Sequence, residues 1–458
     1  MIGSAVSRWT MLHFAVAIAF FVLAQATMVM GIAYPSVPLA APMTLAAVHL
    51  LTIGWLTLLM LGALHQFVPV ITAQRIAAGP SALVSLVAIS TGVIAMDTGF
   101  VALGGHLPQA VVMALPAGGL LVLGGAIAAC APLGRMLWRT RPLPFSARFV
   151  AVGLVFLLAT VILGILMGLV FSRPSLMPWP NVVSKGFRLH LLAGLFGWFA
   201  LTAMGVSYRL LTMFTLAPEE RGSLGTAVLV LSAGGLAATW LLSVVAAVDA
   251  SLPAASIVTA AAAMALGFCL YLVDMVRLYR GRRRHKLELN TGMALPALAA
   301  FALCVPLAAW IAIRGDAGAL AGPLAYLFLF GGLSGLGLSQ LYKIVPFLTW
   351  LERYGSLLGK QPVPRVQDLI DERRDRPWFV LYFAAVAIGT VFGMLGWSVP
   401  WRAAIFTHLL ATLMIVRALW LVRHRAPRIA RPDASAINPS SMPPTHFSTG
   451  SLPRSDNA

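Results

Sequence analysis

The chain has 458 residues, of which 60% are hydrophobic and only 10% are charged. This composition leaves too little polar surface to cover water-soluble domains, so it predicts a protein whose solvent is a lipid bilayer. The net charge of +18 does not indicate nucleic-acid binding, because the basic runs are not interleaved with aromatic residues or set in a nucleic-acid-binding pattern.

Apolar runs of about 20 residues, long enough to cross a hydrocarbon layer of ~30 Å as helices, recur along the whole chain. They predict an all-α polytopic bundle of about twelve transmembrane helices, because backbone groups in lipid must be hydrogen-bonded within the protein. The membrane domain is expected over residues 1–429, followed by a disordered cytoplasmic tail at 430–458. The runs lie near residues 11–33, 43–71, 80–104, 107–131, 148–172, 187–214, 223–246, 254–279, 293–313, 321–349, 378–397 and 401–423.

The first apolar run follows Arg8 and contains small residues at Ala24 and Ala26, which a signal peptidase could read. Its apolar stretch is longer than the core of a usual signal peptide, so we expect a retained membrane helix. The three cysteines form no Cys-x-x-Cys arrangement and give no support for disulfides, zinc fingers or covalently attached haem; they are Cys130, Cys269 and Cys304.

The basic residues predict the orientation in the membrane. With the N-terminus inside, all but five of the 32 Lys and Arg fall in cytoplasmic segments, where they can also contact anionic lipid. Both termini are therefore expected in the cytoplasm, with the protein in the inner membrane of a bacterium. The five exceptions are Arg173, Lys185, Arg188, Arg314 and Arg402.

One segment occurs three times, with a period of about 140 residues. Its copies lie on the second, sixth and tenth predicted helices, so the chain divides into three four-helix units near 11–131, 148–279 and 293–425. The copies are HLLTIGWLTLLMLGALHQFVP at His49–Pro69, HLLAGLFGWFALTAMGVSYRLLT at His190–Thr212 and YLFLFGGLSGLGLSQLYKIVP at Tyr326–Pro346.

Each copy has two aromatic positions. In the first copy these are His49, near the outer surface, and His65, near the cytoplasmic end; in the third they are Tyr326 and Tyr342. Sixteen residues of uniform α-helix separate the two positions by about 24 Å and by roughly 160° around the axis. The two positions are therefore not expected to bind one metal ion together.

Three four-helix units with histidines on the second and sixth helices resemble subunit I of the haem-copper oxidases. The His-x-x-x-x-Gly-Trp segment at His49 and the KIVPFLTWLERYG stretch from Lys343 are similar to oxidase-I-like bacterial membrane proteins without the full catalytic set, such as the NnrS family of haem- and copper-containing proteins. The resemblance covers most of residues 11–425. It implies that His49 matches a low-spin haem ligand and that His190 approximately matches a copper ligand.

The sequence also departs from the oxidases. The seventh helix of that family carries a histidine pair, whereas residues 223–246 contain no histidine. The tenth carries two haem-ligating histidines, whereas residues 321–349 offer only Tyr326 and Tyr342. Carboxylates within the predicted helices are few, with Asp97 and Asp274 the main examples. A complete oxygen-reducing centre is therefore not expected.

His49, His190 and His408 all lie near the outer starts of helices, and we expect them to form a layer that ligates a b-type haem or, at His49 and His190, copper. The alternative for each is an imidazole that is hydrogen-bonded within the core. Arg188 and Arg402 shortly precede two of these histidines and are expected to pair with haem propionates; the alternative is an interfacial anchor. For His13, His65 and His424 we expect structural or interfacial roles.

The sequence thus predicts a haem-binding membrane protein in respiratory redox or nitrosative-stress physiology, without complete oxygen-reductase chemistry. Respiratory-chain subunits or electron-transfer proteins are the expected partners. Two alternatives remain open: a transporter of a small or metal-containing solute, and an assembly scaffold for a respiratory complex. The shared direction of the three motif copies and the nearly apolar midplane favour the haem protein.

Overall fold

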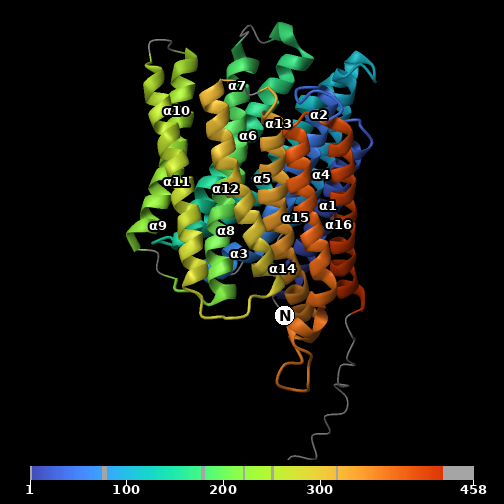
Figure 1. Ribbon diagram of the computed structural model, residues 1–458, viewed down its shortest axis with the longest axis vertical. Helices are drawn as coiled ribbons and strands as arrows, with labels where there is room; N and C mark the ends of the chain where they lie inside the picture. Colours follow the sequence, from blue (N-terminus) through green and yellow to red (C-terminus); the bar gives the residue numbers. More distant parts are fainter. Residues whose placement is uncertain are drawn as a thin grey trace, which may run out of the picture.

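The computed structural model describes residues 3–74, 80–176, 181–219, 222–248, 252–315 and 318–425. Within these ranges all regular structure is helical, and twelve helices are long and apolar enough to cross a membrane. The predicted all-α bundle is therefore confirmed (Figure 1). The predicted disordered tail at 430–458 lies outside the described residues.

The helices run alternately between two ends of the bundle. The chain starts at the end drawn at the bottom of Figure 1, which we call the lower end; the opposite end is the upper end. Nine spans are formed largely by single helices or by a helix with a short interruption: α1 Gly3–Val29, α4 Ser81–Leu103, α5 Ala114–Arg139, α6 Phe145–Ser172, α9 Gly222–Leu229 with α10 Gly235–Val248, α11 Ala254–Arg280, α12 Leu289–Arg314, α15 Glu372–Met394 and α16 Ser398–Arg425.

A five-residue π-helical segment, Val230–Gly234, joins α9 to α10, and the three motif spans share longer π segments of eight or nine residues. Each motif span begins as a short α-helix, widens into a π-helix and returns to α-helix, as in α2 Pro42–His49, η1 Leu50–Thr57 and α3 Leu58–Thr72. Because a π-helix places more residues in each turn, the angle of roughly 160° predicted from uniform α-helix geometry does not apply. The other two are α7 Asn181–Leu191, η4 Leu192–Ala200 and α8 Leu201–Thr215, and α13 Ala321–Tyr326, η6 Leu327–Ser334 and α14 Gly335–Tyr354.

The motif spans form the centre of the bundle. In an 18-residue stretch of each motif span at least 67% of the residues are buried, whereas no other span exceeds 44%. The outer spans instead expose large apolar side chains, among them Val155, Ile162 and Val258, as expected for helices that face lipid. The repeated segment is therefore the structural core around which the other helices pack.

Within each unit, the first helix inserts a phenylalanine against a glycine of the motif helix. Any side chain at these glycines would overlap the ring, so the glycines are required for the close approach of the two helices. A Cβ added at Gly54 would lie 2.6 Å from Phe20 Cγ, one at Gly197 2.4 Å from Phe156 Cγ, and one at Gly332 2.3 Å from Phe301 Cε1.

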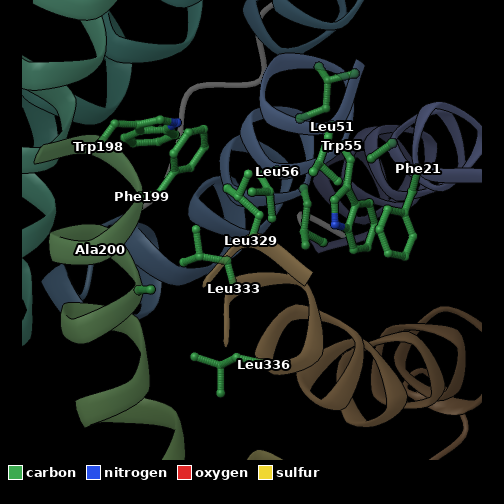
Figure 2. Close-up of a cluster of buried hydrophobic side chains, with 14 of the residues drawn as sticks. Phe21, Leu51, Trp55, Leu56, Trp198, Phe199, Ala200, Leu329, Leu333 and Leu336 are labelled. Atoms are coloured by element: carbon green, nitrogen blue, oxygen red, sulfur yellow. The ribbon is translucent and has the colours of Figure 1, made fainter. Parts of the chain in front are cut away.

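Between units, buried tryptophans join the motif helices. Figure 2 shows Trp198 of the second unit beside the first unit, and Trp55 of the first unit beside Phe21. The Trp55 indole nitrogen donates to Ser334 Oγ on the third motif helix at 2.9 Å. These contacts close the middle of the bundle with well-packed apolar side chains.

Candidate functional site

The structure brings His49 and His190 together. Their ring centroids are 6.4 Å apart and the ring planes make an angle of 37°. His49 ends α2 and His190 is the next-to-last residue of α7, so each imidazole lies where its helix widens into the π segment. Counted from the starts of their spans at Pro42 and Lys185, both lie about 8–10 Å along the helix from the upper end.

Backbone carbonyls orient both rings. His49 Nδ1 lies 2.7 Å from the Leu45 carbonyl oxygen, and His190 Nδ1 lies 2.9 Å from the Thr160 carbonyl oxygen. A carbonyl only accepts hydrogen bonds, so each Nδ1 carries the proton and donates it. Each Nε2 therefore keeps an unprotonated lone pair, which is the state required to ligate a metal.

The surroundings of the pair are aromatic and closely packed. Phe100 on α4 stacks on His49, with ring centroids 5.0 Å apart and planes at 28°. Gly164 on α6 faces His190, and a Cβ added there would lie 3.2 Å from the His190 Cε1 atom. Both imidazoles are nevertheless half-buried rather than fully enclosed. The site is thus closely packed but not completely buried.

A carboxyl group with one unpaired buried oxygen lies near this site, on the same helix as Phe100. Asp97 precedes Phe100 by three residues, so the two side chains share a face of α4. Its Oδ1 atom is buried and has no hydrogen-bond partner in the described ranges. A buried polar atom without a partner is costly, so Asp97 marks a place for an additional polar group.

His408 occupies a different environment. Its ring contacts in the described chain are with aromatic side chains, including Tyr382 at 4.4 Å and Phe330 at 5.2 Å between centroids. Its Nδ1 atom lies 3.5 Å from the Tyr326 hydroxyl, and its Nε2 atom is buried without a partner there. Of the three histidines expected in one layer, His49 and His190 therefore form a pair, whereas His408 lies apart from them among aromatic side chains.

The two expected arginines also differ. Arg402 donates from Nε and Nη2 to the Val29 carbonyl, at 3.1 and 2.8 Å, and so caps the end of α1. Arg188 is exposed near the upper end, two residues before His190. Arg188 is thus available to a charged group above the pair, whereas Arg402 is already engaged by the backbone.

Two histidines that were expected to be structural or interfacial lie together at the opposite end. His13 on α1 and His65 on α3 are buried, with ring centroids 5.8 Å apart. No sequence pattern marks this pair, because the residues are on different helices. His424 is exposed and stacks on Trp420, in keeping with an interfacial position.

The pair of His49 and His190 offers two protein ligands. Within the described ranges, no group of three or more His, Cys, Asp or Glu residues is placed to hold a metal ion. A site built only from protein would therefore be incomplete for zinc, which requires three or four ligands. Two imidazoles are sufficient for haem iron, because the porphyrin provides the other four nitrogens.

No model of a known protein family matches this chain, and no curated protein matches it in sequence. The chemistry of the histidine pair therefore has to be inferred from its geometry.

Proposed function

We propose that this chain is a haem-binding membrane redox protein in which His49 and His190 would hold a b-type haem through their Nε2 atoms. The observation that carries the proposal is the separation of 6.4 Å between two imidazoles with unprotonated Nε2 atoms. A metal–imidazole bond of about 2.0 Å and a ring radius of about 1.2 Å place two opposite ligands roughly 6 Å apart.

The residues around the pair have distinct roles in this proposal. The Leu45 and Thr160 carbonyls hold the two rings in one tautomer and increase the basicity of Nε2. Phe100 excludes water from one side of His49. A haem bound here would supply one-electron transfer, and Arg188 would pair with a propionate at the upper end. Copper is the alternative occupant; a copper(II) ion would need ligands beyond the two imidazoles.

The cellular setting is part of the same proposal. The lower end, where most basic residues lie, is assigned to the cytoplasm of a bacterium and the site to the outer half of its inner membrane. Electron-transfer partners of the respiratory chain are the proposed partners. The proposed physiology is respiratory redox or the response to nitrosative stress, without complete oxygen reduction.

The transporter alternative receives less support from the structure. Repeats in secondary transporters commonly have inverted topology and broken helices at the midplane. Here the three motif spans start at the same end, and the middle of the bundle is filled by buried side chains such as Trp55 and Trp198. A scaffold for a respiratory complex would share this fold but would need no haem.

A reduced-minus-oxidised absorption spectrum of the purified protein tests the proposal. We expect the bands of a b-type cytochrome, and electron paramagnetic resonance of the oxidised protein should show low-spin iron with two imidazole ligands. Protein that contains neither haem nor copper after growth with both available would refute the proposed function.

A further inference from the structure

We propose that His13 and His65 form a separate metal site, at the lower end of the first unit, which binds one copper(I) ion between the two imidazoles. The site is distinct from the proposed haem site at His49 and His190. It does not depend on the haem proposal, because it uses other residues at the other end of the motif span.

The two rings are held for a common ligand. Their centroids are 5.8 Å apart, close to the roughly 6 Å expected for two imidazoles on one ion. His13 Nδ1 lies 2.9 Å from the Trp9 carbonyl oxygen, and His65 Nδ1 lies 2.6 Å from the Leu61 carbonyl oxygen. Both Nδ1 atoms therefore donate to their own helices, and both Nε2 atoms keep a lone pair.

Neither lone pair is satisfied by the protein. His13 is 1% exposed and His65 is 2% exposed, and both Nε2 atoms are buried without a hydrogen-bond partner in the described ranges. Two acceptors cannot satisfy each other, so each buried nitrogen costs free energy unless a third group lies between them. A cation serves two lone pairs at once, and so does a water molecule that donates both of its O–H groups; titration with copper(I) separates the two.

In the other two units, the residue that corresponds to His65 is a tyrosine that is hydrogen-bonded to an aspartate. Tyr208 corresponds to His65 in the second copy and donates to Asp274 Oδ2 at 3.0 Å. Tyr342 corresponds to it in the third copy and donates to Asp375 Oδ2 at 2.8 Å. In both cases a donor meets an acceptor within the protein. In the first unit alone, two acceptors meet, which indicates that an additional group is required there.

The coordination number selects the ion. Zinc and other divalent ions require more ligands than two, and the rings are too buried to add a shell of water. A haem is also excluded, because fully buried imidazoles leave no space for a porphyrin. Copper(I) accepts two nearly opposite imidazole ligands, and its single charge is less costly to bury in an apolar bundle than a double one.

Gly62 and Thr10 position the helix contact that holds the two histidines. A Cβ added at Gly62 would lie 2.7 Å from the Cβ atom of His13, so α1 and α3 touch at this point. Thr10 Oγ1 donates to the Gly62 carbonyl at 3.1 Å, and Gln66 Nε2 donates to Thr10 Oγ1 at 3.1 Å. These bonds fix the register in which the two rings face the same space.

The experiment titrates the purified full-length protein with copper(I) under anaerobic conditions against a competing copper(I) chelator. We expect one equivalent bound by the wild type, and an X-ray absorption spectrum with two imidazole nitrogens around copper. His13→Phe and His65→Phe should each weaken binding by more than about tenfold, because each removes one of two ligands. His424→Phe is the matched control and should bind as the wild type does.

Three further measurements separate this site from the haem site and from a loss of folding. His49→Ala should keep the copper(I) equivalent, and His13→Phe should keep the haem spectrum of the wild type. Gly62→Ala retains both ligands but displaces His13, so it should also weaken copper(I) binding. A wild type that takes no copper(I) from the chelator would overturn the proposal, as would equal binding by the wild type and both histidine variants.

Discussion

The Trp198 indole nitrogen donates to Thr57 Oγ1 at 3.0 Å, and this bond joins the second motif helix to the first. Trp55 makes the corresponding bond to Ser334, from the first motif helix to the third. Trp55 and Trp198 occupy one motif position, and Thr57 and Ser334 occupy another. The same donor and acceptor positions are therefore used on two sides of a triangle of helices.

The third side of this triangle, between the third and second motif helices, has neither the tryptophan donor nor the hydroxyl acceptor. The third copy has Gly332 where the others have tryptophan, and the second copy has Ala200 where the others have a hydroxyl. Neither a donor nor an acceptor is left unpaired by this change, so it carries no desolvation cost. This pattern is the one expected if the three units are related by rotation about an axis along the bundle.

The first prediction concerns this junction. Thr57→Val removes the acceptor and leaves the buried Trp198 N–H unpaired, so unfolding in detergent should become easier by about 1–3 kcal/mol. The double variant Thr57→Val, Trp198→Phe should lose less stability than the sum of the losses in Thr57→Val and Trp198→Phe alone. Thr91→Val, which changes an exposed hydroxyl bonded within its own helix, is the control and should lie within about 0.5 kcal/mol of the wild type. Additive losses would argue against the bond.

The second prediction concerns pH and the lower end. Glu288 precedes α12 and lies 2.5 Å from Lys343 and from Arg284. Burial acts to raise the pKa of Glu288, but these two cations outweigh it and hold the pKa below its usual value. The stabilisation that ionised Glu288 contributes is therefore complete above its ordinary pKa of about 4.3. It is lost as the pH falls through the lowered pKa of the folded protein.

Thermal unfolding of the wild type and of Glu288→Gln, measured from pH 7 down to pH 3, checks this. The wild type should be more stable than the variant at neutral pH, and the difference should shrink below about pH 4. Glu219→Gln is the control, because Glu219 pairs with Arg209 but its side chain is 71% exposed. A difference between wild type and Glu288→Gln that is independent of pH would contradict the assignment.

The third prediction concerns topology. In a background without Cys130, Cys269 and Cys304, a cysteine at Ser175 should react with an impermeant thiol reagent in intact cells, since the upper end is expected to face outward. A cysteine at Arg283 should react only after lysis. Labelling of Arg283→Cys in intact cells would reverse the proposed orientation.

The twelve spans followed from hydropathy because an apolar helix in lipid needs little beyond length and composition. Their lengths were less well predicted: the fourth, expected at 107–131, extends to Arg139 in the structure. The extension past 131 includes basic residues at the lower end, which lower the mean hydropathy without ending the helix. The amino-acid composition of a span therefore defines its centre better than its ends.

The site was only partly predictable. The repeat and the family resemblance made His49 and His190 candidate ligands, but they did not predict the Thr160 carbonyl that orients His190 from 30 residues away. The π-helical segments carry no residue pattern distinct from that of an apolar α-helix. The contact of His13 with His65 depends on how α1 packs against α3, and this packing is a tertiary property that a single helix does not encode.

The fourth prediction separates the histidines by function. His49→Ala and His190→Ala should each abolish or shift the haem spectrum while protein abundance in the membrane stays largely unchanged. His408→Ala should keep the spectrum, because His408 lies in its own aromatic box with Tyr326 and Tyr382. His424→Ala is the control at an exposed position. Loss of haem only in His408→Ala would move the site to that box.

The last prediction concerns the two arginines at the upper end. Arg402 is engaged at the Val29 carbonyl, so Arg402→Gln should lower the thermal stability by about 1–3 kcal/mol and leave the haem spectrum unchanged.

Arg188 is exposed above the pair, so Arg188→Gln should leave stability within about 0.5 kcal/mol of the wild type. It should also lower the haem midpoint potential, because removing a positive charge near a propionate destabilises the reduced, more negative state of the haem. Arg188→Lys keeps the charge and should restore much of the potential. If Arg402→Gln changes the potential and Arg188→Gln does not, the propionates lie on the α16 side of the bundle and the proposed orientation of the haem is wrong.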